Sequence, residues 1–146
     1  MNGIGTGLDM PHLPPQHRYT GLDLTCAMLK QALPRASALN FCPVQGDAQR
    51  LPFADHSFDI VVLHLILPVV PEPAGSLQES ARVTLRGGSL LVFDKFLKPG
   101  ERARWKRALN PLARRIATRL DVVFEEMLAQ TPALSLEEDE PALAGG

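Results

Sequence analysis

The sequence is poor in several features that would each point to a particular class of protein. Only two of its 146 residues are cysteines, Cys26 and Cys42, and neither has a second cysteine or a histidine nearby at metal-ligand spacing. We therefore expect no disulfide framework and no zinc site, and both cysteines to be reduced and packed. No apolar run approaches the ~20 residues that a membrane-spanning helix needs, and the first residues lack a signal-peptide pattern. A cytoplasmic protein is the resulting expectation.

A strong excess of charge is also missing. The formal net charge is -1, with 21% charged and 45% hydrophobic residues, which is typical of one soluble globular domain covering residues 1–146. A chain of this length can bury a single core. Nucleic-acid-binding domains are usually strongly basic, so we expect no nucleic-acid partner. Asp55, Asp59 and Asp94 are too scattered along the sequence for a metal site, and we expect none.

Short β-rich runs alternate with amphipathic helical stretches, which predicts an α/β fold with a mostly parallel sheet. Strands are expected over 19–23, 40–45, 58–65 and 89–94, and helices from a cap at Thr25, over 74–84 and over 101–120. The runs at 58–65 and 89–94 are nearly continuous in apolar residues, so we expect these strands to be buried on both faces.

Weaker signals complete the secondary-structure prediction. A short helix is expected near 8–12, a turn at 86–88 and a further helical piece at 122–128. Residues 133–137 have the composition of a late strand. The predicted helix at 101–120 carries apolar residues on one face, with a kink expected at Pro111.

Three segments suggest a nucleotide-like ligand. Gly3, Gly5 and Gly7 form a glycine run that lets the backbone approach a ligand closely, although such a run can equally be a flexible terminus. Asp23 closes the next predicted strand, where a carboxylate can accept the hydroxyl hydrogens of a ribose or simply mark a strand end. Asp47 follows the strand after that. Because parallel strands end at one edge of a sheet, the three segments should face one crevice.

Four successive motifs of the sequence are Gly3-Ile4-Gly5-Thr6-Gly7, Tyr19-Thr20-Gly21-Leu22-Asp23-Leu24, Gly46-Asp47-Ala48-Gln49-Arg50-Leu51-Pro52-Phe53 and Ser57-Phe58-Asp59-Ile60-Val61. In order and spacing they resemble the motifs of class I S-adenosylmethionine-dependent methyltransferases. The branch they resemble acts on small molecules, including quinone precursors and phospholipid head groups. The resemblance covers nearly the whole chain. It implies a Rossmann-like three-layer α/β sandwich and methyl transfer from S-adenosylmethionine to a small-molecule or lipid acceptor.

The resemblance also implies roles for individual residues. Gly3, Gly5 and Gly7 would line the methionine part of the cofactor and Asp23 would hold its ribose. The remaining cofactor-binding residues would be Asp47 and Ala48 at the adenine, with Leu24 and Met28 packed beside the adenosine. His64 would face the reacting methyl group and act as the base; a histidine that satisfies a structural hydrogen bond is the other reading.

Two departures from the family pattern concern the sheet. The acidic residue and the strand that precede the glycine run in the family are absent, because that position is Met1. The last antiparallel strand is also absent. We therefore expect a sheet that lacks its first central strand and its last antiparallel strand, with unpaired backbone groups on the edges facing the inner gap. The working hypothesis is a partial methyltransferase domain, either active or retained as a non-catalytic binding domain.

Two further readings concern partners and cofactors. The stretch from Lys95 to Arg119 holds nine of the 15 Lys and Arg residues, so its predicted helix could contact anionic lipid at a membrane surface, or simply be a solvated face. A nicotinamide-dependent dehydrogenase would share the glycine run and the ribose acid. That class needs a G-x-G-x-x-G pattern leading into a long helix, whereas prolines soon follow Gly7. The acceptor and the oligomeric state are not specified by the sequence.

Overall fold

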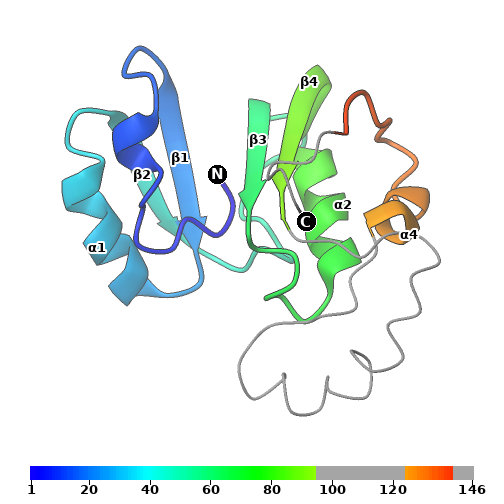
Figure 1. Cartoon of the computed structure of the whole chain (residues 1–146), viewed down its shortest axis with the longest axis horizontal. Coiled ribbons are helices and arrows are strands. Elements are labelled where there is room, and N and C mark those ends of the chain that lie inside the picture. Colours follow the sequence, from blue (N-terminus) through cyan, green and yellow to red (C-terminus); the bar gives the residue numbers. More distant parts are fainter. Residues whose placement is uncertain (95–123, 140–146) are drawn as a thin grey trace, which may run out of the picture.

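Two pairs of parallel strands form the sheet structure of the protein (Figure 1). The computed structural model describes residues 1–94 and 124–139. One pair is β1 (Arg18–Asp23) with β2 (Asn40–Gln45), and the other is β3 (Phe58–His64) with β4 (Thr84–Phe93). In each pair a helix lies between the two strands in sequence, as parallel neighbours require. The predicted mostly parallel α/β fold is confirmed.

The N-terminus lies between the two strand pairs and joins them (Figure 1). Asn2 forms parallel bridges with Leu22 of β1 and Leu63 of β3, and its backbone N–H donates to the Val62 carbonyl at 2.8 Å. On the other side, the Leu22 N–H donates to the Met1 carbonyl at 3.0 Å. Over the described residues, a single residue therefore stands where a full inner strand would pair with both neighbours.

A small hollow of about 20 Å³ lies at this junction. Met1 and side chains of β1 and β3, among them Thr20 and Phe58, line it. The Met1 ammonium group donates to the Thr20 carbonyl at 2.7 Å, and burial lowers the pKa of this amine from 8.0 to about 6. The sheet thus continues across the gap only at its carboxyl end, which agrees with the expected lack of an inner strand.

Helices cover the strands and follow the predicted order. Helix α1 (Cys26–Arg35) contacts β1 and β2, and α2 (Pro73–Val83) contacts β3 and β4. The short α4 (Phe124–Ala129) packs on α2, and a 3-10 helix, η1 (Met10–His12), follows the glycine run. Helix α2 begins with Pro73, which favours a first helical position because its missing N–H would have no helical partner there.

The main core lies between the strands and α2. Its buried members share positions on the inward faces of these elements and on the loops between them: Leu22, Leu51, Val61, Leu63, Leu67, Leu77, Val83 and Met127. Burial of each large apolar side chain stabilises the fold by roughly 1.5–3 kcal/mol. The core holds the carboxyl ends of β1 and β3 in fixed positions, and the candidate site lies there.

Several predicted details of the strands are wrong. Strand β4 starts at Thr84, directly after α2, so Arg86-Gly87-Gly88 lies inside the strand and not in a turn. Thr84 pairs with Phe58 and Ser89 with Ile60, so the register with β3 shifts between these two pairs. The extra residues of β4, which include Gly87 with a φ of +77°, form an irregularity within the strand.

Burial of the strands also differs from the prediction. Neither β3 nor β4 is buried on both faces over the described residues, since Ile60 is 58% exposed and Leu91 54% exposed. Residues 133–137, expected as a late strand, have no regular structure. The reason is common to these errors: an apolar run fixes neither the strand's partners nor what covers each face.

Other local predictions have mixed outcomes. The short helix near 8–12 is confirmed, and the piece at 122–128 is confirmed from Phe124 onward. Thr25 precedes α1 as expected but makes no side-chain cap. Both Cys26 and Cys42 are free, as expected, but exposed instead of packed. The predicted helix at 101–120, with its kink at Pro111, lies outside the described residues.

Candidate functional site

The carboxylate of Asp23 joins two segments of the candidate site. Asp23 is the last residue of β1, and its Oδ2 accepts a hydrogen bond from the Gly5 backbone N–H at 2.9 Å. Its Oδ1 accepts from the backbone N–H of Thr25 at 2.9 Å. One side chain therefore fixes the glycine run against the end of β1 and the start of α1. Each carboxylate oxygen has a second lone pair, so hydroxyl donors of a ligand can still be accepted.

The glycines of this loop serve different purposes. Gly7 has a φ of +72°, and a Cβ there would lie 2.8 Å from the Ala32 Cβ, so the loop packs directly on α1. Gly5 has a φ of +53°, but a Cβ would meet nothing within 4 Å. Gly7 is thus required by packing, whereas Gly5 combines a left-handed backbone with open space beside it. Open space next to a glycine backbone is what a closely approaching ligand needs.

The loop after β2 adjoins the same edge. The backbone N–H of Gly46 donates to the Asp23 carbonyl at 3.0 Å, which continues the parallel register past the end of both strands. Asp47 is exposed, and its Oδ1 accepts from the Gln49 backbone N–H at 2.9 Å. Ala48 is buried. The structure therefore places the glycine run against the Asp23 side chain and Gly46, the residue before Asp47, against the Asp23 backbone.

Two apolar side chains are exposed beside Asp23. Leu24 is 68% exposed and Met28, on the first turn of α1, is 39% exposed. Exposed side chains of this size offer apolar surface to a flat ring without any rearrangement of the core.

His64 ends β3 at the same edge and is paired with a residue that the sequence reasoning missed. Its Nδ1 lies 2.6 Å from the Asp9 Oδ2, and its ring packs edge to face on Phe93 with 4.9 Å between centroids. Asp9 lies two residues after Gly7, the last glycine of the run, so the run, Asp23 and His64 form one connected region. The sequence carries no signal for this pair, because the two residues are far apart along the chain and neither belongs to a shared motif.

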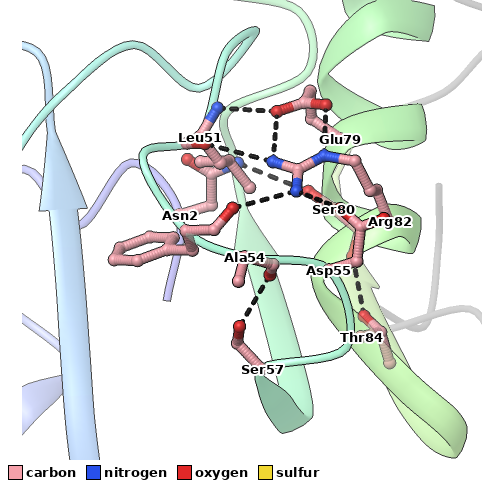
Figure 2. Close-up of polar contacts among 10 residues, drawn as sticks. Asn2, Leu51, Ala54, Asp55, Ser57, Glu79, Ser80, Arg82 and Thr84 are labelled. Atoms are coloured by element: carbon pink, nitrogen blue, oxygen red, sulfur yellow. Dashed lines mark hydrogen bonds and ion pairs between the residues drawn. The ribbon is translucent and has the colours of Figure 1, made fainter.

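The loop between Asp47 and β3 is anchored on α2 by a charged network (Figure 2). Arg82 donates to both carboxylate oxygens of Glu79 at 2.7 and 2.8 Å, and to the Phe53 carbonyl at 2.9 Å. Glu79 in turn accepts from the Leu51 backbone N–H at 2.8 Å. The hydrogen bond from Arg82 lowers the pKa of the Glu79 carboxyl group from its ordinary 4.5. This network, which the sequence reasoning also missed, fixes the loop that begins with Asp47.

Comparisons with known proteins agree on the class of this domain. A family model described as a methyltransferase domain matches residues 2–92, and the chain belongs to this family. The chain is 33% identical to a phosphatidylethanolamine N-methyltransferase from Cereibacter sphaeroides, over 99% of this chain and 73% of that protein. It is 40% identical to a demethylmenaquinone methyltransferase from Renibacterium salmoninarum, over 63% of this chain and 38% of that protein.

Solved structures share the fold. A Bacillus halodurans protein assigned as a methyltransferase superposes with a TM-score of 0.77 at 26% identity, over 89% of this chain and 59% of that one. An arsenic(III) S-adenosylmethionine methyltransferase from Chlamydomonas reinhardtii superposes with a TM-score of 0.67 at 21% identity, over 90% of this chain and 48% of that one. The second likeness shows the fold alone. The Rossmann-like methyltransferase fold predicted from the motifs is confirmed.

Two further features of the described residues bear on partners. Over residues 1–94 and 124–139, no three His, Cys, Asp or Glu side chains gather as ligands for a metal ion. The helices of this part of the chain are too short or too polar to cross a membrane.

Proposed function

We propose that the chain binds S-adenosylmethionine at the carboxyl ends of β1, β2 and β3 and transfers its methyl group to a small-molecule or lipid acceptor. The observation that carries the proposal is the position of Asp23. Its carboxylate links the glycine run to the end of β1, and its backbone carbonyl accepts a hydrogen bond from the Gly46 N–H. Membership of the methyltransferase family supports the binding of S-adenosylmethionine at this edge of the sheet.

Each loop at the edge suits one part of the cofactor. Asp23 would accept the ribose hydroxyl hydrogens, and the open side of Gly5 would admit the methionine part, with Gly3 and Gly7 shaping the loop. The adenine would lie against the Asp47 side chain and the Ala48 backbone. The exposed apolar surface of Leu24 and Met28 would pack beside it.

The acceptor that we propose first is the amine of a phospholipid head group, because the relative matched over 99% of this chain is a phosphatidylethanolamine N-methyltransferase. A quinone precursor is second, on the likeness to a demethylmenaquinone methyltransferase. When bound, the cofactor supplies a methyl group activated by its sulfonium. The protein's part is to align the acceptor, exclude water and take up a proton, for which we propose His64.

Calorimetric titration with S-adenosylhomocysteine tests the binding site. Asp23→Asn should weaken binding by about 10- to 100-fold, because a hydrogen bond to a charged group contributes roughly 1.5–3 kcal/mol. Asp59→Asn is the matched control, since Asp59 is exposed near the amino end of β3, at the opposite edge. Thermal unfolding of both variants separates lost binding from lost fold. Equal affinities for Asp23→Asn and the unsubstituted chain would exclude the proposed site.

Transfer of a labelled methyl group to phosphatidylethanolamine or to demethylmenaquinone tests turnover. Methylation of one acceptor identifies its class. Tight binding of S-adenosylhomocysteine with no transfer to either would instead support the non-catalytic binding domain. That alternative draws on the junction of the sheet, where, within the part of the chain that the structure describes, Asn2 is the one residue bridged to both strand pairs.

A further inference from the structure

The pairing of His64 with Asp9 has a geometry that a structural role for Asp9 does not explain. Asp9 immediately precedes η1, a position where an aspartate commonly accepts hydrogen bonds from the first N–H groups of a helix. Its side chain makes no such cap and instead places Oδ2 at 2.6 Å from the His64 Nδ1. Asp9 contributes to the turn through its backbone, because its carbonyl accepts a hydrogen bond from the His12 N–H at 3.0 Å.

The contact determines which ring nitrogen of His64 carries the proton. An ionised carboxylate can only accept a hydrogen bond, so the Nδ1 atom must donate. In the neutral ring, Nε2 then has the free lone pair. The edge-to-face contact with Phe93, at an interplanar angle of 78°, restricts the ring from a second side. Both side chains are partly exposed, at 33% for His64 and 42% for Asp9, so a substrate can approach the pair.

The position of Asp9 also connects this pair to the cofactor loop. Asp9 lies two residues after Gly7, in a segment folded back by hydrogen bonds from the Gly7 N–H to the Ile4 carbonyl and from the Met10 N–H to the Gly7 carbonyl. These hydrogen bonds connect the glycine run to the residue whose carboxylate contacts the His64 ring. The partner of the proton acceptor and the glycine run of the proposed methyl donor site therefore lie on one short segment.

We propose that Asp9 is a positioning residue, which holds the His64 ring with Nδ1 protonated and Nε2 presented to the acceptor of the methyl group. The inference rests on the proposed function. In the step it serves, the nucleophilic atom of the acceptor forms a bond to the methyl carbon while the carbon–sulfur bond breaks. The sulfonium becomes a neutral thioether, and the proton of the acceptor passes to the His64 Nε2. Asp9 then faces the resulting imidazolium and stabilises its charge.

The tautomer can be measured without any activity. The chain has four histidines, and their ring nitrogens can be observed by NMR in protein labelled with [15N]histidine at alkaline pH. His64→Gln identifies the signals of His64 by their disappearance. We expect the Nδ1–H form in the unsubstituted protein and a change to mainly the Nε2–H form in Asp9→Ala. Asp9→Asn, which keeps an oxygen acceptor, should largely retain the Nδ1–H form, and Asp59→Ala should leave the His64 signals unchanged.

Kinetics supply the second readout. In Asp9→Ala we expect kcat to fall by about 10- to 100-fold, as is typical when the partner that orients a functional histidine is lost. KM and the affinity for S-adenosylhomocysteine should change little, because Asp9 contacts His64 and not the ribose site. Asp9→Asn should recover part of kcat.

The outcomes separate this inference from the function on which it rests. An unchanged His64 tautomer in Asp9→Ala overturns the positioning role, whatever the enzyme does. A changed tautomer with an undiminished kcat overturns it as well. If the unsubstituted chain neither binds S-adenosylhomocysteine nor methylates either acceptor, the proposed function fails, and the role of the pair in proton transfer fails with it. A changed tautomer together with a lower kcat supports both.

Discussion

Replacing Arg82 should loosen the loop that carries Asp47, and the structure sets the size of the effect. The guanidinium makes five hydrogen bonds: two to Glu79, one to Asp55 at 2.7 Å, and one each to the carbonyls of Phe53 and Leu51 at 2.9 and 3.1 Å. Arg82→Met keeps most of the aliphatic chain and removes all five donors. The two carbonyls then lose the Arg82 donors, and the Glu79 carboxylate retains the hydrogen bond from the Leu51 N–H.

The expected loss in the free energy of unfolding is about 2–3 kcal/mol. A neutral hydrogen bond contributes about 1 kcal/mol and one to a charged group about 1.5–3 kcal/mol, but exposed ion pairs contribute much less. The Asp55 side chain is 66% exposed, so its share is small, whereas that of Glu79 is only 22% exposed. Arg82→Lys should recover less than half of the loss, because an ammonium group cannot replace the planar fork.

Urea denaturation followed by linear extrapolation measures the change. Arg86→Met is the matched control: Arg86 is exposed on β4, and we expect its substitution to change the stability by less than about 0.5 kcal/mol. S-adenosylhomocysteine should also bind Arg82→Met more weakly. A loss for Arg82→Met no larger than that for Arg86→Met would refute the reasoning that this network anchors the loop.

The same network predicts a dependence on pH. The Arg82 hydrogen bond lowers the pKa of Glu79 in the folded state, so the folded protein binds fewer protons here than the unfolded chain does. The stabilisation is fully present above the ordinary pKa of 4.5 and is lost as the pH falls through the lowered value. Arg82→Met should therefore lose less stability on acidification than the unsubstituted protein.

Three other predictions concern the amino-terminal segment and the basic stretch. Because burial lowers the pKa of the Met1 amine from 8.0 to about 6, stability should fall by about 2–3 kcal/mol as the pH drops between these values, and acetylation of the amine should abolish this step in denaturation curves. Gly7→Ala should lower the free energy of unfolding by at least about 2 kcal/mol, since its Cβ would clash with Ala32. Gly5→Ala should lower it by only about 1 kcal/mol but should weaken the binding of S-adenosylhomocysteine. Equal unfolding midpoints for the two variants would contradict this difference. If the basic stretch 95–119 contacts membranes, the protein should sediment with anionic vesicles in a salt-sensitive manner and remain in solution with neutral ones.

Much of the strand order could be predicted because its signals are local. The runs that became β1, β2 and β3 are bounded by turn residues, and their predicted limits differ from the observed ones by one residue at most. Strand β4 was harder, because Arg86-Gly87-Gly88 has the composition of a turn. Only the structure shows that these residues lie within β4, as an irregularity between Thr84, which pairs with Phe58, and Ser89, which pairs with Ile60. A Cβ on Gly88 would meet the Asp59 carbonyl at 2.6 Å.

Burial was the least predictable property. The apolar side chains of Met28 and Leu33 stand on α1 near Leu29, yet only Leu29 is buried, because the strands cover one narrow side of the helix. Cys42 is exposed on β2 for a similar reason, since that strand lies at the end of the described sheet. Exposure depends on which element lies opposite a residue, and that is a property of the assembled fold.

The sequence by itself determined the alternation of strands and helices, and with it the edge at which Gly3–Gly7, Asp23 and Asp47 meet. Parallel strands must end on the same side of their sheet, so residues that follow such strands become neighbours whatever the details of packing. The tertiary structure alone decided which side chains pair across that edge, such as Asp9 with His64. Those contacts join residues distant in the chain, and their geometry depends on how the loops settle on the core.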